Sequence, residues 1–448
     1  MSCTTSFRPL TLLGAALLSV SLAGPWAGPC IAPASAQAPP HPHDAKAELL
    51  ERAHRVLREA PLVDGHIDIP WQYRTRVQNR LDGLDLAADL TQLDRPTHTD
   101  IPRLRAGGVG GVFWSVYIPV RRRGGEPGDA RTVFEQIDLV HRMVERYSDD
   151  LEIALTADDI IRIHSEGRIA SLMGMEGGHS IENSLAVLRQ LYNAGARYMT
   201  LTHGLNLFWA DSATDEEVLG GLNEFGREVV REMNRLGMLV DLSHVSHKTM
   251  HDALDVAEAP VIFSHSSAFA ICAHPRNVPD DVLQRMSANG GVVMVTFFPS
   301  YTSEPLRQWQ VDEREELARL RREFTDPADG GEIQRNIQQW RRENPRPSPT
   351  LEQVADHIDH VRAVAGIDHI GIGSDYDGMP PGPIGLEDAS TFPRLLVELF
   401  ERGYSDEDVK KIIGLNVVRA LRESEEVAAR LQQERGPSEM LMDPPTAR

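Results

Sequence analysis

The chain has 448 residues and a formal net charge of -20 at neutral pH. This charge argues against nucleic acid as a partner, because phosphate backbones are bound by clustered Lys and Arg. The length allows a core large enough to fold without disulfide staples, and Cys272 is the one cysteine beyond the N-terminal leader.

Residues 1–36 have the pattern of a signal peptide. Arg8 gives a weakly positive beginning, residues 10–23 are apolar, and residues 34–36 are a small-residue cleavage site. A membrane anchor is the alternative, but the apolar run is short and is soon broken by Pro25. We therefore predict an exported protein, periplasmic or secreted, whose mature chain has no membrane span.

Buried strands alternate with amphipathic helices along the rest of the chain. Helical spacing of apolar residues predicts a helix over residues 45–58 and further helices between most of the strands. Eight strands with intervening helices predict an α/β fold, a TIM-type (β/α)8 barrel over residues 37–435. The predicted strands are residues 62–67, 108–117, 169–176, 197–203, 238–242, 261–264, 291–297 and 369–374.

The fifth and sixth strands show the pattern most clearly. With the helix between them, for which Ser246 is the expected N-cap, they form a parallel βαβ unit. His244 and His265 follow these two strands, so we expect both at the same end of neighbouring strands. Two imidazoles in that position can share one metal ion.

Polar side chains also follow other strands at their C-terminal ends, where barrel enzymes have their chemistry. One such residue has a structural explanation as a cap, a turn or an ion pair, but six strands of eight end this way. A buried carboxylate or imidazole costs free energy unless it is paired or binds a metal. The residues are His66 and Asp68 after the first strand, then Glu176, His203, His244, His265 and Asp375.

The number of candidate ligands suggests two metal ions. His66 and Asp68 lie on the same side of the first strand and can hold one ion, while His244 and His265 can hold the other. Glu176 can bridge the two ions with its two oxygens. Nitrogen and oxygen ligands without thiolate suit zinc best, with manganese or cobalt as alternatives. Two such ions activate a shared water as a nucleophile at neutral pH.

Two regions lie outside the barrel alternation. Residues 303–349 are rich in Arg, Glu and Gln and predict a helical insertion after the seventh strand, either a lid or a solvated surface excursion. After it, Thr350 and Gln353 form a capping box that begins the next helix. We predict that residues 436–448 form a disordered tail.

Several segments resemble the membrane dipeptidase (renal dipeptidase) family of zinc metallopeptidases, from about residue 63 to about residue 421. The chain departs at Ile67 and Ile69, where the family commonly has Asn and Leu, but neither position is a candidate ligand. The matching motifs are DGHIDIPW (64–71), MEGGHS (175–180), RYMTLTHGLNLFWADS (197–212), VDLSHVS (240–246), FSHSSA (263–268), RNVPDD (276–281) and GIDHIGIGSDYDG (366–378).

The resemblance implies a metal-dependent amidohydrolase-like barrel with two zinc ions, held by the same five ligands as above. It implies that His203 stabilises the oxyanion and that Asp375 carries a proton from the metal-bound water to the leaving amine. It further implies that Arg276 pairs with the C-terminal carboxylate of the substrate, assisted by Tyr301. Without the resemblance, Arg276 would be taken for a surface arginine.

The predicted function is hydrolysis of dipeptides, L,L and L,D, by a metal-bridging hydroxide, and a homodimer fits the resemblance. Another hydrolase of the same barrel type, which cleaves an N-acyl amino acid or a lactone, is the nearest alternative. A metal-loaded binding protein is a second alternative. Asp375 disfavours it, because a binding protein needs no proton shuttle after the eighth strand.

Overall fold

The computed structural model describes residues 42–122, 125–126, 128–326 and 330–442. The predicted signal peptide and the last residues of the predicted tail, 443–448, lie outside these ranges, so both stay predictions. Within the described ranges, no helix combines the length and the apolar character needed to cross a bilayer.

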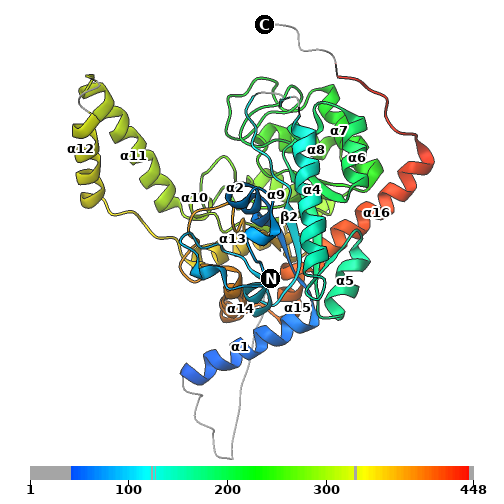
Figure 1. Cartoon of the computed structure of the whole chain (residues 1–448), viewed down its shortest axis with the longest axis horizontal. Helices are drawn as coiled ribbons and strands as arrows, with labels where there is room; N and C mark the ends of the chain where they lie inside the picture. The colour runs from blue at the N-terminus through cyan, green and yellow to red at the C-terminus, as the bar shows by residue number, and fades with distance from the viewer. Residues whose placement is uncertain (1–41, 123–124, 127, 327–329, 443–448) are drawn as a thin grey trace, which may run out of the picture.

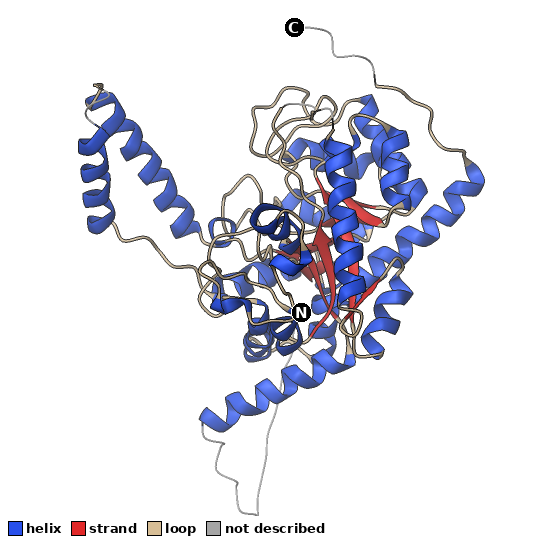
Figure 2. Cartoon of the chain, in the orientation of Figure 1, coloured by secondary structure: helices blue, strands red, loops and turns tan. Residues whose placement is uncertain are grey.

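Parallel strands at the centre of the molecule form a barrel (Figure 2). Around the ring the order is β2-β1-β9-β8-β7-β6-β5-β4, and pairing of β2 with β4 closes it. The predicted TIM-type barrel is therefore confirmed. The strands are β1 (Leu62–Ile67), β2 (Val109–Ser115), β3 (Leu151–Ile153), β4 (Ile169–Glu176), β5 (Ala196–Thr200), β6 (Leu239–Asp241), β7 (Val261–Phe263), β8 (Val292–Val295) and β9 (Ile370–Ile372).

The strand β3 is the one that the sequence did not predict. It pairs with the beginning of β4, on the side where β5 takes over further along that strand. Three residues are too few to show a periodic pattern, so the sequence gives no signal for it. Several predicted strands also end earlier than expected. β5, for example, ends at Thr200, and His203 therefore lies in the following loop.

Helices surround the barrel (Figure 1) because each has one apolar stripe to bury. In α4, Val133, Ile137, Val140 and Val144 are all buried, as their spacing predicts. The helices, apart from those of the insertion, are α1 (Pro42–Glu59), α2 (Ile69–Val77), α3 (Ile101–Ala106), α4 (Asp129–Arg146), α5 (Ala157–Ser165), α6 (Leu185–Asn193), α7 (Glu224–Leu236), α8 (His247–Val256), α9 (Asp280–Asn289), α10 (Pro299–Thr302), α13 (Leu351–Val364), α14 (Phe392–Glu401), α15 (Asp406–Lys410) and α16 (Asn416–Glu434).

Two predicted helix starts are confirmed by their caps. The hydroxyl of Ser246 accepts a hydrogen bond from the backbone N–H of Thr249 at 3.2 Å, which begins α8. The side chain of Gln353 accepts from the backbone N–H of Thr350, also at 3.2 Å, which begins α13.

The predicted insertion after the seventh barrel strand, β8, is a helical hairpin. Its helices α11 (Glu304–Glu323) and α12 (Gly330–Glu343) project away from the barrel (Figure 1). The rings of Trp309 and Trp340, 5.6 Å apart, pack between them. No residue of α11 or α12 lines the hollow at the barrel mouth. This arrangement favours the surface excursion over the lid.

Candidate active site

Most of the predicted site residues line one hollow of about 480 Å³ at the barrel mouth. They come from the loops and strand ends after β1, β4, β5, β6, β7, β8 and β9, so the barrel geometry brings them together although they lie far apart in sequence. His66 is fully buried beneath the hollow. The predicted residues that line it are Asp68, Glu176, His203, His244, His265, Arg276, Tyr301 and Asp375.

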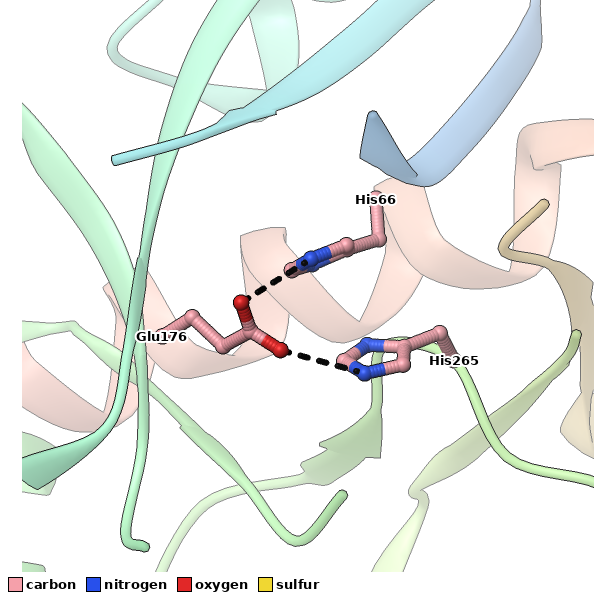
Figure 3. A group of neighbouring side chains, drawn as sticks. All are labelled: His66, Glu176 and His265. Atoms are coloured by element: carbon pink, nitrogen blue, oxygen red, sulfur yellow. Dashed lines mark ion pairs between the residues drawn. The ribbon is translucent and has the colours of Figure 1, made fainter. Parts of the chain in front are cut away.

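Glu176, at the end of β4, lies between two sets of imidazole nitrogens (Figure 3). Its Oε2 is 3.5 Å from Nε2 of His66. Its Oε1 is 2.9 Å from Nε2 of His244 and 3.5 Å from Nε2 of His265. These two Nε2 atoms are only 2.9 Å apart, so they point at one place. The two carboxylate oxygens thus face two different ligand sets, as a bridging ligand requires.

Asp68 completes the first set. Its Oδ2 is 3.3 Å from Nε2 of His66. Nε2 of His66 and Oδ1 of Asp68 are both buried and have no hydrogen-bond partner within the part of the chain that the structure describes. Buried polar atoms rarely lack a partner, so an imidazole nitrogen and a carboxylate oxygen left without hydrogen bonds, on side chains 3.3 Å apart, fit a bound cation.

Geometry alone also admits two further ligands. Three groups have ligand atoms that all lie within 4.8 Å of one another: His66 with Glu176 and His265, Glu176 with His203 and His244, and His66 with Asp68 and Asp375. His203 and Asp375 therefore lie close enough to join the two sets. The other roles expected for them, stabilisation of the oxyanion by His203 and proton transfer by Asp375, stay predictions.

Burial would lower the pKa of His66, but Tyr198 and the carboxylates of Asp68 and Glu176 raise it well above its ordinary value, whereas the other two candidate imidazoles have the protonation state that suits metal binding. Burial lowers the pKa of both His244 and His265 well below the ordinary value, and the neutral imidazole is the form that binds a metal. Burial alone would raise the pKa of Glu176, but the charges of His66 and His203 lower it well below its usual range. Burial, aided by the Asp68 carboxylate, raises the pKa of Asp375 well above its usual range. Asp375 is thus a carboxyl group that can hold a proton.

The second nitrogen of two ligand imidazoles is anchored. Nδ1 of His66 lies 2.7 Å from the hydroxyl of Tyr198. Nδ1 of His265 lies 2.8 Å from Oγ of Ser264, and that hydroxyl donates to Oδ2 of Asp241 at 2.7 Å. Since the Ser264 hydroxyl has one proton and gives it to Asp241, Nδ1–H of His265 must be the donor to Ser264. This tautomer leaves Nε2 free to bind a metal.

Loss of this anchor should weaken metal binding. We expect Ser264→Ala to lower the metal affinity of the folded protein by about 10- to 100-fold, because the His265 ring loses the partner that fixes its tautomer and orientation. Competition with a chromophoric chelator measures the affinity directly. Ser287→Ala, on the exposed surface of α9, is the matched control. An affinity unchanged in Ser264→Ala would contradict the role of the anchor.

The backbone is strained at two of these residues. His244 and Asp375 both have φ of 68°, in the left-handed region that residues other than glycine rarely adopt. The carbonyl of His244 accepts from the backbone N–H of Ala213 at 2.7 Å, and the N–H of Asp375 donates to the carbonyl of His66 at 3.1 Å. Such conformations persist only where surrounding bonds fix them, and they concentrate at functional sites.

Arg276 is buried, whereas the sequence pattern without the family resemblance predicts a surface arginine. It is no surface arginine, since only 1% of it is exposed. Its Nη1 and Nη2 each donate one long bond of 3.3 Å, to Oγ of Ser266 and the carbonyl of His265, while Nε has no partner within the described residues. Its guanidinium carbon lies 5.3 Å from the ring centre of Tyr301. A buried cation on the wall of a hollow, with no acidic side chain paired to it among the described residues, fits an anionic ligand.

Sequence reasoning missed several side chains that form the walls of the hollow. Trp71, Tyr117 and Phe298 supply aromatic surfaces, and Gln72 and Asp377 lie at one side. Aromatic residues beside buried strands are usually part of the core, so no sequence signal separated these from core residues. The motif DYDG did contain a signal for Asp377, because it lies two residues after Asp375.

Comparison with known proteins agrees with this geometry. Residues 50–435 match the family described as Membrane dipeptidase (Peptidase family M19). The chain belongs to this family. Dipeptidase verJ from Clonostachys rogersoniana is 42% identical over 393 residues, which are 86% of this chain and 89% of that protein.

Solved structures of similar fold include two dipeptidase-type proteins. The probable dipeptidase PvdM from Pseudomonas aeruginosa has a TM-score of 0.71 at 25% identity, covering 87% of this chain and 100% of that one. A metallo peptidase from Rhodobacter sphaeroides, liganded with a phosphinate mimic of the dipeptide L-Ala-D-Ala, has a TM-score of 0.65 at 23% identity. That match covers 82% of this chain and 99% of that one.

Family membership confirms the resemblance drawn from the motifs. The membrane dipeptidase-family chain is a hydrolase that acts on peptide bonds, a metallopeptidase with dipeptidase activity. A metal cofactor is part of that identity, and the clustered ligand atoms at the barrel mouth are where these residues could hold it.

Proposed function

We propose that the chain is a zinc-dependent dipeptidase that binds two zinc ions. The ligands are His66 and Asp68 for one ion, His244 and His265 for the other, and Glu176 between them. The observation that carries this proposal is that the two oxygens of Glu176 face different imidazoles, Oε2 that of His66 and Oε1 those of His244 and His265. When bound, the two ions supply an activated water and polarise the peptide carbonyl.

In this proposal, Asp375 transfers a proton to the leaving amine. Its carboxyl group lines the hollow, and its raised pKa allows it to hold a proton until the amine departs. Its position within 4.8 Å of the ligand atoms of His66 and Asp68 puts it beside the first ligand set, where it would take a proton from a water activated by a metal bound there. Delivery of this proton to the leaving amine completes the cleavage of the peptide bond.

Arg276 and His203 position the substrate in this proposal. Arg276 binds the C-terminal carboxylate as a guanidinium fork, and the ring of Tyr301 lies against it. His203 stacks on His244 with ring centres 4.3 Å apart and lines the same hollow, so that it donates an N–H to the oxyanion. Tolerance of a D-residue at the C-terminal position rests on the family resemblance alone.

His203 is tested by truncation. We expect His203→Ala to lower kcat about 100-fold, since loss of one oxyanion donor costs roughly 3 kcal/mol, while the metal content stays that of the wild type. Steady-state kinetics with metal analysis of the same sample separates the two effects. His141→Ala, an exposed residue on α4, is the control. Loss of metal in His203→Ala would instead make His203 a ligand, as the geometry also admits.

An N-acyl amino acid is a second candidate substrate, because its carboxylate also fits Arg276. A free carboxylate next to an amide bond satisfies the same guanidinium, whether the acyl group carries an amine or not. Parallel assays on L-Ala-L-Ala and N-acetyl-L-alanine separate the two. We expect the dipeptide to be the better substrate, and the opposite result would move the assignment to an aminoacylase.

Export and self-association complete the proposal. The leader pattern in residues 1–36 supports export to the periplasm or the medium. The family resemblance supports a homodimer. A small-molecule dipeptide remains the proposed partner, with no role for nucleic acid, which the negative charge disfavours.

A further inference from the structure

A second hollow, of about 460 Å³, adjoins the active-site hollow. Gln72 and Asp377 line both, so the two hollows meet at these side chains. The rest of its lining comes from two segments, residues 76–103 after β1 and residues 379–388 after β9. Nothing in the chemistry proposed above uses this space.

The position of the second hollow relates it to one end of the substrate. Arg276 and Tyr301 line the first hollow only, and they follow β7 and β8. The second hollow is lined by the loops after β9 and β1, the next strands in the ring after β8, and it meets the first hollow at Gln72 and Asp377, away from the wall that Arg276 lines. A dipeptide that pairs its carboxylate with Arg276 and extends toward Gln72 and Asp377 would bring its N-terminal residue to the second hollow.

Two arginines give this hollow its charge. Arg76 and Arg95 form no ion pair with any described residue, although most guanidinium groups of this acidic chain do. Nε of Arg76 donates to Oε1 of Gln72 at 2.7 Å, and its Nη1 donates to the backbone carbonyl of Arg95 at 2.5 Å. Burial lowers the pKa of Arg76, and Arg95 adds to this while Asp377 opposes it, so the two positive charges lie close together.

Two of the three acidic side chains that line the hollow, Asp388 and Glu387, pair with arginines. Asp388 accepts from Arg103 at 3.4 Å and from the backbone N–H of Ser390 at 2.9 Å. Glu387 lies 3.3 Å from a guanidinium nitrogen of Arg394. Oδ1 of Asp377 accepts from the backbone N–H of His98 at 2.7 Å. Arg76 and Arg95 are therefore the two lining cations that form no ion pair with a described residue, against one acidic atom, the buried Oδ2 of Asp377, that has no hydrogen-bond partner among the described residues.

We propose that the second hollow receives the side chain of the substrate's N-terminal residue and that Arg76 and Arg95 select an anionic side chain there. This inference rests on the proposed dipeptidase function, because it takes the carboxylate position at Arg276 as given. The volume of the hollow leaves room for a side chain longer than that of aspartate.

Matched substrates test the selection. L-Glu-L-Ala and L-Gln-L-Ala have nearly the same shape and differ in charge, and α-aminoadipyl-L-Ala carries the carboxylate one methylene further. We expect kcat/KM for the Glu peptide to exceed that for the Gln peptide about 5-fold, mainly through KM, as one partly exposed ion pair provides. The aminoadipyl peptide should do at least as well. The advantage should shrink at 1 M NaCl, which screens exposed charges.

Variants then assign the preference to these residues. Arg95 is exposed and its side chain forms no hydrogen bond or ion pair with another described residue, so Arg95→Gln removes the charge with little structural change. The Glu-to-Gln ratio of kcat/KM should fall toward 1 in Arg95→Gln and in Arg76→Gln. Arg80→Gln, which removes an exposed charge from the same segment outside this hollow, should keep the wild-type ratio.

The outcomes are distinct. If wild-type protein hydrolyses both peptides at equal kcat/KM, or if Arg95→Gln and Arg76→Gln both keep the preference, the anionic subsite is wrong and the dipeptidase function stands. If the metal-loaded protein hydrolyses no dipeptide, the proposed function itself is wrong and the subsite falls with it.

Discussion

Glu176→Gln is expected to reduce dipeptide hydrolysis roughly 1,000-fold or more, because the amide that replaces the bridging carboxylate removes a negative charge shared by both ligand sets. Glutamine keeps the shape of the side chain, so the fold should survive. The amide nitrogen would face imidazole Nε2 atoms that now lie 2.9 to 3.5 Å from the oxygens of Glu176. Metal content per chain should fall together with activity.

Kinetics and metal analysis on the same preparation check this prediction. Glu145→Gln, an exposed residue on α4, is the control for purification and folding. A Glu176→Gln protein that retains both its metal and its activity would remove Glu176 from the centre of the site. The remaining ligand groups would then have to hold the metal without a bridge.

Arg276→Met is expected to lower kcat/KM for dipeptides on the order of 1,000-fold, chiefly through KM. The reason is that a buried guanidinium that pairs with a carboxylate contributes several kcal/mol, and methionine offers no donor. A dipeptide amidated at its C-terminus should already be a poor substrate for the wild type. The preference for acid over amide should therefore disappear in Arg276→Met.

The same substitution should make the substrate-free protein more stable. The guanidinium is only 1% exposed and its bonds to protein atoms are two of 3.3 Å, so removal of its charge should raise the free energy of unfolding by roughly 1 kcal/mol or more. Arg314→Met, an exposed residue on α11, should change neither activity nor stability. Equal rates on acid and amide substrates in the wild type would rule out the carboxylate role of Arg276.

The barrel and the clustering of the five proposed ligands were predictable because they follow from regular elements. Alternation along β1 placed His66 and Asp68 together, and the βαβ unit from β6 to β7 placed His244 beside His265. The carboxyl ends of parallel strands share one edge, so residues far apart in sequence share one site. These inferences needed only the period of the apolar residues and the direction of the strands.

The rest depends on loops, where no periodic pattern exists. Arg276 lies in the loop after β7, and its guanidinium lies against the ring of Tyr301, which belongs to a different segment, α10 after β8. The direction of the α11–α12 hairpin depends on contacts that helical spacing does not encode. The bond from Ser264 to Asp241 joins residues of two neighbouring strand ends, and its role emerged only with their distance.

The most direct test of the account is hydrolysis of a panel of L,L and L,D dipeptides by the purified protein before chelation, after chelation and after zinc is restored, with metal analysis at each step. The account predicts that activity disappears with the metal and returns as about two zinc ions bind per chain. Activity that persists after the metal is removed, or a folded zinc-loaded protein that cleaves no dipeptide, would contradict it.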